Sequence, residues 1–260
     1  MGLFDKLFGK TTEPTGSANT KPQQNLPPCK TEKEFLERFG GIVLDRQLTF
    51  GEIIETDTNS WNVDMEKEEI SFSASLVFSM QALGTISHSS QSWLWAWANV
   101  KSGFSESVTK QSLQLKKYGE DNQIDILRNS TFAFTKDELH LIGIIASGLF
   151  NSSAYYIADY GQGAMVLTVK SDEVDKVFNN NPLSHLRIFS VFPQLISQFD
   201  MNHKLALINY LRAKGYSISE EQNNIVGTKG ADSVIAEFDS SSRLIELNGR
   251  QHGIANSGDE

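Results

Sequence analysis

Cysteine is almost absent from this chain of 260 residues, which contains Cys29 alone. A disulfide within the chain is therefore excluded, and the predicted setting is the reducing cytoplasm. Because 39% of the residues are hydrophobic, the chain can bury a core without covalent cross-links. We interpret the lone thiol as a neutral part of the packing.

Clusters of lysine and arginine are also missing, and the formal net charge is -9. A nucleic-acid partner is excluded on this ground, because phosphate recognition needs a concentrated basic surface. An acidic surface instead favours solubility or the binding of a basic protein. The predicted partner is therefore a basic protein.

Charged residues are absent between Ile70 and Val100, which raises the question of a membrane span. However, this run alternates apolar with small polar residues, as at Phe72, Ala74 and Leu76. Such alternation favours buried strands over a membrane helix.

Strong catalytic motifs are absent: the chain has no P-loop, His-Glu-x-x-His, Gly-x-Ser-x-Gly or Cys-x-x-Cys. The segment Asp57–Asn62 lacks the glycine of a calcium loop, and Gly161–Gly163 lacks the third glycine of a dinucleotide-binding turn. No two histidines lie at metal-ligand spacing on one element; they are His88, His140, His185, His203 and His252. We predict no catalytic residue, no metal and no cofactor, which favours a protein that is not an enzyme.

The first ten residues place four apolar side chains on one helical face: Leu3, Phe4, Leu7 and Phe8. This pattern predicts a short amphipathic helix over residues 1–10, which makes weak contact with a membrane surface or docks on a partner. The alternatives are a helix folded back on the domain and a disordered segment. Residues 11–30, rich in proline and polar residues, are predicted to be a flexible linker, and residues 251–260 a disordered tail.

Residues 31–172 are predicted to form the main α+β domain. Thr31 and Glu34 have capping-box spacing at the start of a helix, which Gly40-Gly41 is expected to break or kink. Helices are also expected over 105–117, where Tyr118-Gly119 is the predicted stop signal, and over Leu139–Phe150. The remaining pattern predicts an antiparallel sheet packed with helices, with strands at Trp61–Met65, Ile70–Phe78, Leu83–Ser87, Trp93–Asn99, Tyr155–Ile157 and Met165–Val169.

Residues 183–250 are predicted to form a small C-terminal α+β domain. Helices are expected at Leu183–Phe199 and His203–Lys214. Strands follow at Ile225–Thr228, Ser233–Phe238 and Arg243–Leu247. The expected arrangement is helices followed by a three-stranded meander.

The most informative segment is Trp93-Leu94-Trp95-Ala96-Trp97-Ala98-Asn99. If it is a strand, its three indoles lie on one side of a sheet. They then form either a ladder in the core or the floor of a pocket, with His88 and Asn99 nearby. These five residues are the candidate ligand-binding set: His88, Trp93, Trp95, Trp97 and Asn99.

The same tryptophan segment, together with Leu83-Gly84-Thr85 and Tyr155-Tyr156, resembles a bacterial family, the domain of unknown function numbered six-eight-eight-two. The resemblance covers roughly Trp61–Val169. It implies a bacterial origin and a shared fold, and it carries over no catalytic residues to this chain.

Two classes of function follow. The favoured one is a noncatalytic protein-interaction module, resembling immunity or adaptor proteins, that binds through its acidic surface. The alternative is a small-molecule binder or hydrolase with a tryptophan-lined cleft. Truncation of Trp93 separates them, because a core tryptophan costs about 3–5 kcal/mol of stability when cut to alanine, whereas a cleft tryptophan costs little.

Overall fold

A computed structural model describes residues 26–55, 60–134 and 138–250 of the chain. The predicted N-terminal helix with Leu3, Phe4, Leu7 and Phe8, most of the predicted linker and the predicted tail lie outside these residues. The described chain begins at Leu26, and the side chain of Cys29 is buried in the core. The Cys29 carbonyl oxygen accepts a hydrogen bond from the Tyr118 hydroxyl at 3.0 Å. Burial raises the pKa of the Cys29 thiol to about 11, so it stays protonated near neutral pH.

The first described helix, α2 (Glu32–Ile54), begins as predicted, with the Glu34 amide donating to the Thr31 hydroxyl at 3.2 Å. The expected break at Gly40-Gly41 is wrong, because the helix is continuous through both glycines. A Cβ atom at position 40 would lie 2.9 Å from a methyl group of Leu195, and one at position 41 would lie 2.5 Å from the Tyr210 ring. These glycines therefore allow neighbouring helices to approach α2 closely.

The main sheet is antiparallel and has seven strands. Its centre is β3, which pairs with β7 along one side and with β2 and β4 along the other, while β1, β5 and β6 extend it outward. The strands are β1 (Asn62–Asp64), β2 (Glu69–Ser71), β3 (Val77–Ser87), β4 (Ser92–Trp95), β5 (Thr131–Ala133), β6 (Ala154–Asp159) and β7 (Gly163–Lys170).

The bounds of most predicted strands shift by a few residues, and two strands differ more than that. The strand expected at Ile70–Phe78 is divided between β2 and β3, since the Phe72 amide donates to the Leu76 carbonyl across a tight turn at 2.9 Å. Strand β3 then continues through the strand expected separately at Leu83–Ser87. The strand expected at Trp93–Asn99 ends at Trp95. Its neighbour β5 is short and pairs with residues 92–94 only, so beyond Trp95 the backbone turns into a 3-10 helix, η1 (Ala96–Ala98), followed by η2 (Val100–Ser102).

Helices α3 (Lys110–Asn122), α4 (Asp125–Arg128) and α5 (Leu139–Phe150) accompany this sheet, with α3 packed against β3 and α5 against β6 and β7. The helix expected at 105–117 starts later, because Ser105 accepts from the Val108 amide in a turn before α3. It also continues past Gly119, where a Cβ atom would lie 2.6 Å from Leu127 of α4. Gly119 therefore serves close packing and not the end of the helix.

The C-terminal part consists of α6 (Asp172–Asn179), α7 (Ile188–Gln198) and α8 (His203–Ala213), followed by a second antiparallel sheet. This sheet is a meander of four strands, β8 (Ser217–Glu221), β9 (Asn224–Lys229), β10 (Asp232–Phe238) and β11 (Leu244–Arg250). The fourth strand, β8, was not expected because it is a polar edge strand with Ile218 as its one half-buried apolar residue.

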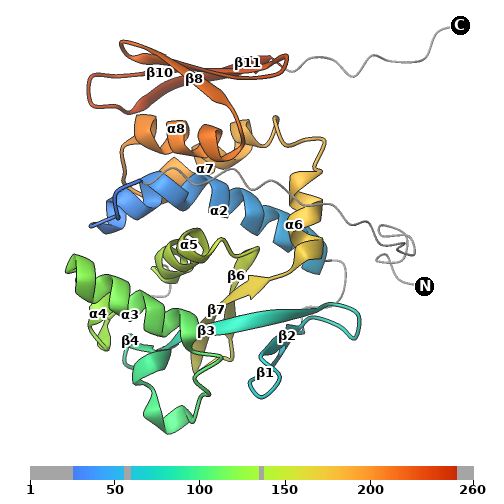
Figure 1. Cartoon of the computed structure of the whole chain (residues 1–260), viewed down its shortest axis with the longest axis vertical. Coiled ribbons are helices and arrows are strands. Elements are labelled where there is room, and N and C mark those ends of the chain that lie inside the picture. Colours follow the sequence, from blue (N-terminus) through green and yellow to red (C-terminus); the bar gives the residue numbers. More distant parts are fainter. Residues whose placement is uncertain (1–25, 56–59, 135–137, 251–260) are drawn as a thin grey trace, which may run out of the picture.

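Helix α2 lies between the two parts of the molecule, with α5 and the main sheet on one side and α7 and α8 on the other (Figure 1). One hydrophobic cluster extends from the tryptophans of β4 through α2 and α5 to the inner face of the meander. The predicted fold class, α+β with an antiparallel sheet packed by helices and a following meander, is confirmed. None of the described helices is both long enough and apolar enough to cross a membrane.

Candidate functional site

Trp93 and Trp95 of β4 lie in the core, with 0% of their surface exposed. Their rings meet edge to face with centroids 5.3 Å apart, and the Trp95 indole N–H donates to the Ile126 carbonyl at 2.9 Å. Gly84 of β3 lies against the Trp93 ring, where a Cβ atom would come within 2.4 Å of it. Neither indole offers a surface to a ligand.

The other predicted ligand-binding residues lie apart from this pair. Trp97 and Asn99 are half-buried beyond the end of β4, and the Lys116 ammonium lies 4.7 Å from the centroid of the Trp97 ring. His88 lies before β4, where its Nδ1 is 3.1 Å from the Gly161 carbonyl oxygen. The structure therefore does not bring the five predicted residues together in one pocket.

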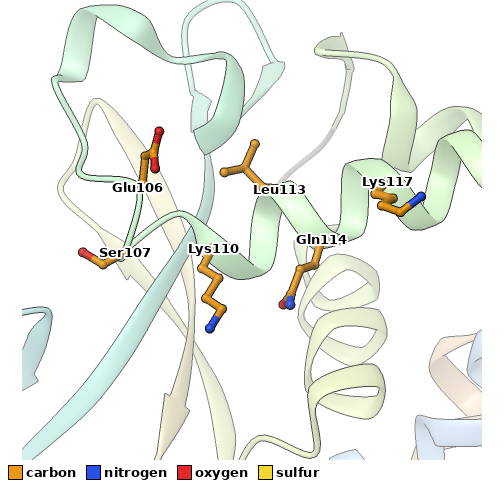
Figure 2. A pocket seen from close by; sticks show the side chains of 6 residues that line it. All are labelled: Glu106, Ser107, Lys110, Leu113, Gln114 and Lys117. Atoms are coloured by element: carbon orange, nitrogen blue, oxygen red, sulfur yellow. The ribbon is translucent and has the colours of Figure 1, made fainter.

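The hollows on the described surface include one beside His88 and one along α3. The smaller, of about 230 Å³, is lined by Ile86, Ser87, His88 and Gln91, so it contains one predicted residue and no tryptophan. The larger, of about 480 Å³, follows the start of α3 and is lined by Glu106, Ser107, Lys110, Leu113, Gln114 and Lys117. Figure 2 shows that these side chains point in different directions, so no set of polar groups converges on a common point. In the described part of the chain, no three His, Cys, Asp or Glu side chains could hold a metal ion together.

A buried charged cluster, which the sequence analysis missed, joins α2 to the C-terminal helices. The Asp45 carboxylate is fully buried and accepts from the Lys214 ammonium and, at 2.8 Å, from the Tyr210 hydroxyl. Arg187 Nη1 lies 3.6 Å from the other Asp45 oxygen and donates to the Thr49 hydroxyl at 2.9 Å. The signal available in the sequence was a single aspartate on the apolar side of a long helix.

Protonation in this cluster is shifted mainly by burial. Burial lowers the pKa of Lys214, and the neighbouring Asp45 carboxylate opposes that effect. Burial and the same carboxylate raise the pKa of Tyr210. Because the side chain of Lys214 is 3% exposed and that of Asp45 is 0% exposed, no substrate reaches these groups. The cluster therefore links α8 and the start of α7 to α2.

The second feature that sequence reasoning missed is the outer face of the meander. Its inner face packs on the helices through Ile225, Val234, Ala236 and Phe238, all buried. The outer face points away from α7 and α8 (Figure 1). We call this outer surface the meander face.

Strand register arranges the meander face in rows that cross the strands. In the acidic row, Glu221 lies opposite Asn224, Asn224 opposite Glu237, and Glu237 opposite Glu246, and all four are exposed. Two residues further along each strand, a second row contains Ser219, Val226, Ile235 and Asn248. We call it the apolar row after its two central residues, of which Ile235 is 45% exposed and Val226 is half-buried. Three carboxylates thus border an exposed apolar centre.

Nearby cations do not neutralise the acidic row. Lys229 of β9 turns inward, where its ammonium donates to the Lys214 carbonyl at 2.8 Å. Arg243 points to the helix layer, 3.0 Å from His203 Nε2. Among the described residues, no salt bridge is made by the three carboxylates of the acidic row, whose one side-chain hydrogen bond comes from Asn248 to Glu246. The meander face therefore carries three carboxylates beside an apolar centre, and Arg250 lies two residues beyond Asn248 on the far side of that centre.

The first part of this architecture matches a known protein family. Residues 33–172 match the Family of unknown function (DUF6882). The chain belongs to this family. The match confirms the resemblance carried by the tryptophan segment and runs from α2 to the start of α6. The DUF6882 region thus contains the tryptophan core, whereas α7, α8 and the meander face lie beyond it. No curated protein and no solved structure gives a significant match to the chain.

Proposed function

We propose that this protein is a noncatalytic interaction module, comparable to an immunity or adaptor protein, that binds a basic protein partner through the meander face. The observation that carries the proposal is the acidic row. Glu237 and Glu246 are directly opposite each other on neighbouring strands, and like charges in that position destabilise a sheet. No described cation relieves the pair, so a basic partner would gain from neutralising it.

Charge and exposure support the same choice. The formal net charge of -9 steers a basic partner toward the protein over distances of about 10 Å. Ile235 offers the partner apolar contact beside the carboxylates. The burial of Trp93 and Trp95 weighs against the alternative, a ligand cleft lined by tryptophan, because neither ring has exposed surface.

The test is affinity purification of the tagged full-length protein from its native host at low salt, followed by mass spectrometry. A double variant, Glu237→Gln with Glu246→Gln, removes two charges from the meander face. The matched control, Glu66→Gln with Glu106→Gln, removes two charges from exposed positions on other parts of the molecule.

The proposal expects a stoichiometric basic protein with the wild type and with the control variant, and its loss with the meander-face variant. It is contradicted by a partner that both variants retain equally, or by a reproducible turnover of a metabolite.

A further inference from the structure

We infer that the partner element recognised by the meander face is a basic amphipathic α-helix that lies across the four strands. This inference rests on the proposed function and specifies the chemistry and shape of its ligand. It follows from the spacing of the acidic row, from the apolar row beside it and from the hydrogen-bonding needs of the ligand backbone.

The acidic row has a defined spacing. Neighbouring strands are about 4.8 Å apart, so Glu237 lies about 5 Å from Glu246 along the row and Glu221 about 10 Å further on. A helix rises about 1.5 Å per residue, and residues i, i+4 and i+11 lie on the same side at about 0, 6 and 16 Å. Lysine or arginine at these three positions can reach the three carboxylates, because their long flexible side chains compensate for the small difference between the two spacings.

The apolar row gives the helix a second stripe of contact. Val226 and Ile235 lie two residues along their strands from Asn224 and Glu237, a separation of about 7 Å. A helix with its side chains is about 10 Å wide and covers both rows at once. The ligand that fits therefore has a basic stripe over the carboxylates and an adjacent apolar stripe over Val226 and Ile235.

An extended peptide is poorly suited to lie along these rows, which cross the strands. A chain that crosses the face of a sheet leaves its own N–H and C=O groups without partners, whereas a helix satisfies them internally. Extended peptides bind instead along a free strand edge, parallel to the strands. The rows of the meander face run perpendicular to the strands, which selects the helix.

The probe for this inference is a synthetic peptide of about 18 residues, long enough to form a helix on binding. It carries lysine at positions i, i+4 and i+11 and leucine on the adjacent stripe. A second peptide of identical composition has its order permuted so that both stripes are lost. Binding to the full-length protein is followed by fluorescence anisotropy at low salt, and peptide helicity by circular dichroism.

We expect the amphipathic peptide to bind at least about tenfold more tightly than the permuted one and to gain helicity on binding. The Glu237→Gln/Glu246→Gln variant should lose about tenfold in affinity, and Ile235→Ser should weaken binding without changing net charge. The Glu66→Gln/Glu106→Gln control should stay within about twofold of the wild type.

Four results would overturn the inference. Equal binding of the two peptides would show that net charge alone drives the interaction, and equal loss in the two charge variants would show that the meander face is not the site. Residues 1–10 of the chain carry Lys6 and Lys10 four residues apart and could compete with the peptide for the meander face. If a protein variant with Phe4→Ser and Leu7→Ser binds the peptide more tightly than the wild type, residues 1–10 are the native ligand of the face. If the peptide fails while the captured partner still depends on Glu237 and Glu246, the helical ligand is refuted and the proposed function stands.

Discussion

Replacing Asp45 with asparagine tests the buried charged cluster most directly. Asparagine keeps the size of the side chain and can still accept a hydrogen bond from Tyr210, so the change removes charge and little else. It leaves the Lys214 ammonium, 3% exposed, without its counter-ion inside the protein. Loss of one partner from a buried ion pair costs about 3–5 kcal/mol, which is a large share of the total stability of an ordinary domain, about 5–15 kcal/mol.

The assay is urea denaturation of the full-length protein, followed by tryptophan fluorescence, with the free energy of unfolding obtained by linear extrapolation. Adding Lys214→Met to Asp45→Asn should recover part of the loss, because an apolar side chain replaces the unpaired charge. The exposed ion pair of Asp121 with Lys117 provides the control, and Asp121→Asn should cost less than about 1 kcal/mol. A loss below about 1 kcal/mol for Asp45→Asn, or strictly additive effects in the double variant, would refute the reasoning.

Three further predictions follow from single contacts. Gly84→Ala should destabilise the protein by about 1–3 kcal/mol in the same assay, because its methyl group overlaps the Trp93 ring, and a neutral effect would contradict the packing described for β3 and β4. Burial, and then the Arg243 guanidinium, lower the pKa of His203, whose Nδ1 accepts a hydrogen bond from the Leu244 amide. Since the unfolded chain binds a proton at this histidine near pH 6.5 and the folded chain resists it, the free energy of unfolding should fall as the pH drops below about 6.5. The His203→Gln variant should flatten that decline. Glu237→Gln should raise stability by about 0.2–0.5 kcal/mol by relieving repulsion from Glu246, and a thermal melt that shows a loss would argue against an unrelieved pair.

Most elements of the main domain could be predicted from local pattern. The helix Leu139–Phe150 and the two strands that contain Tyr155 and Val169 were predicted well, because periodicity acts over a few neighbouring positions. Glycines in helices were misinterpreted at Gly40-Gly41 and at Gly119. A glycine that ends a helix and one that admits a neighbouring helix look the same in a sequence, and the partner that decides between them is distant along the chain.

The candidate site was less predictable. Alternation placed Trp93 and Trp95 on one face, and both are in the core, but pairing with β5 ends at Leu94 and the chain then turns, which moves Trp97 away from them. The Asp45 cluster was missed because it joins residues that lie far apart in the chain. The acidic row was missed because it depends on the register between neighbouring strands, which the predicted strands did not specify.

Composition and patterns within a few residues were enough to establish the α+β class, the family, the acidic charge and the positions of most helices and strands. The faces that those elements cover depend on packing between distant segments. Packing buried Trp93 and Trp95, enclosed Asp45 with Lys214 and aligned Glu221, Glu237 and Glu246 in one row. Strand register and helix packing create these juxtapositions, and both depend on contacts between segments that no local pattern specifies.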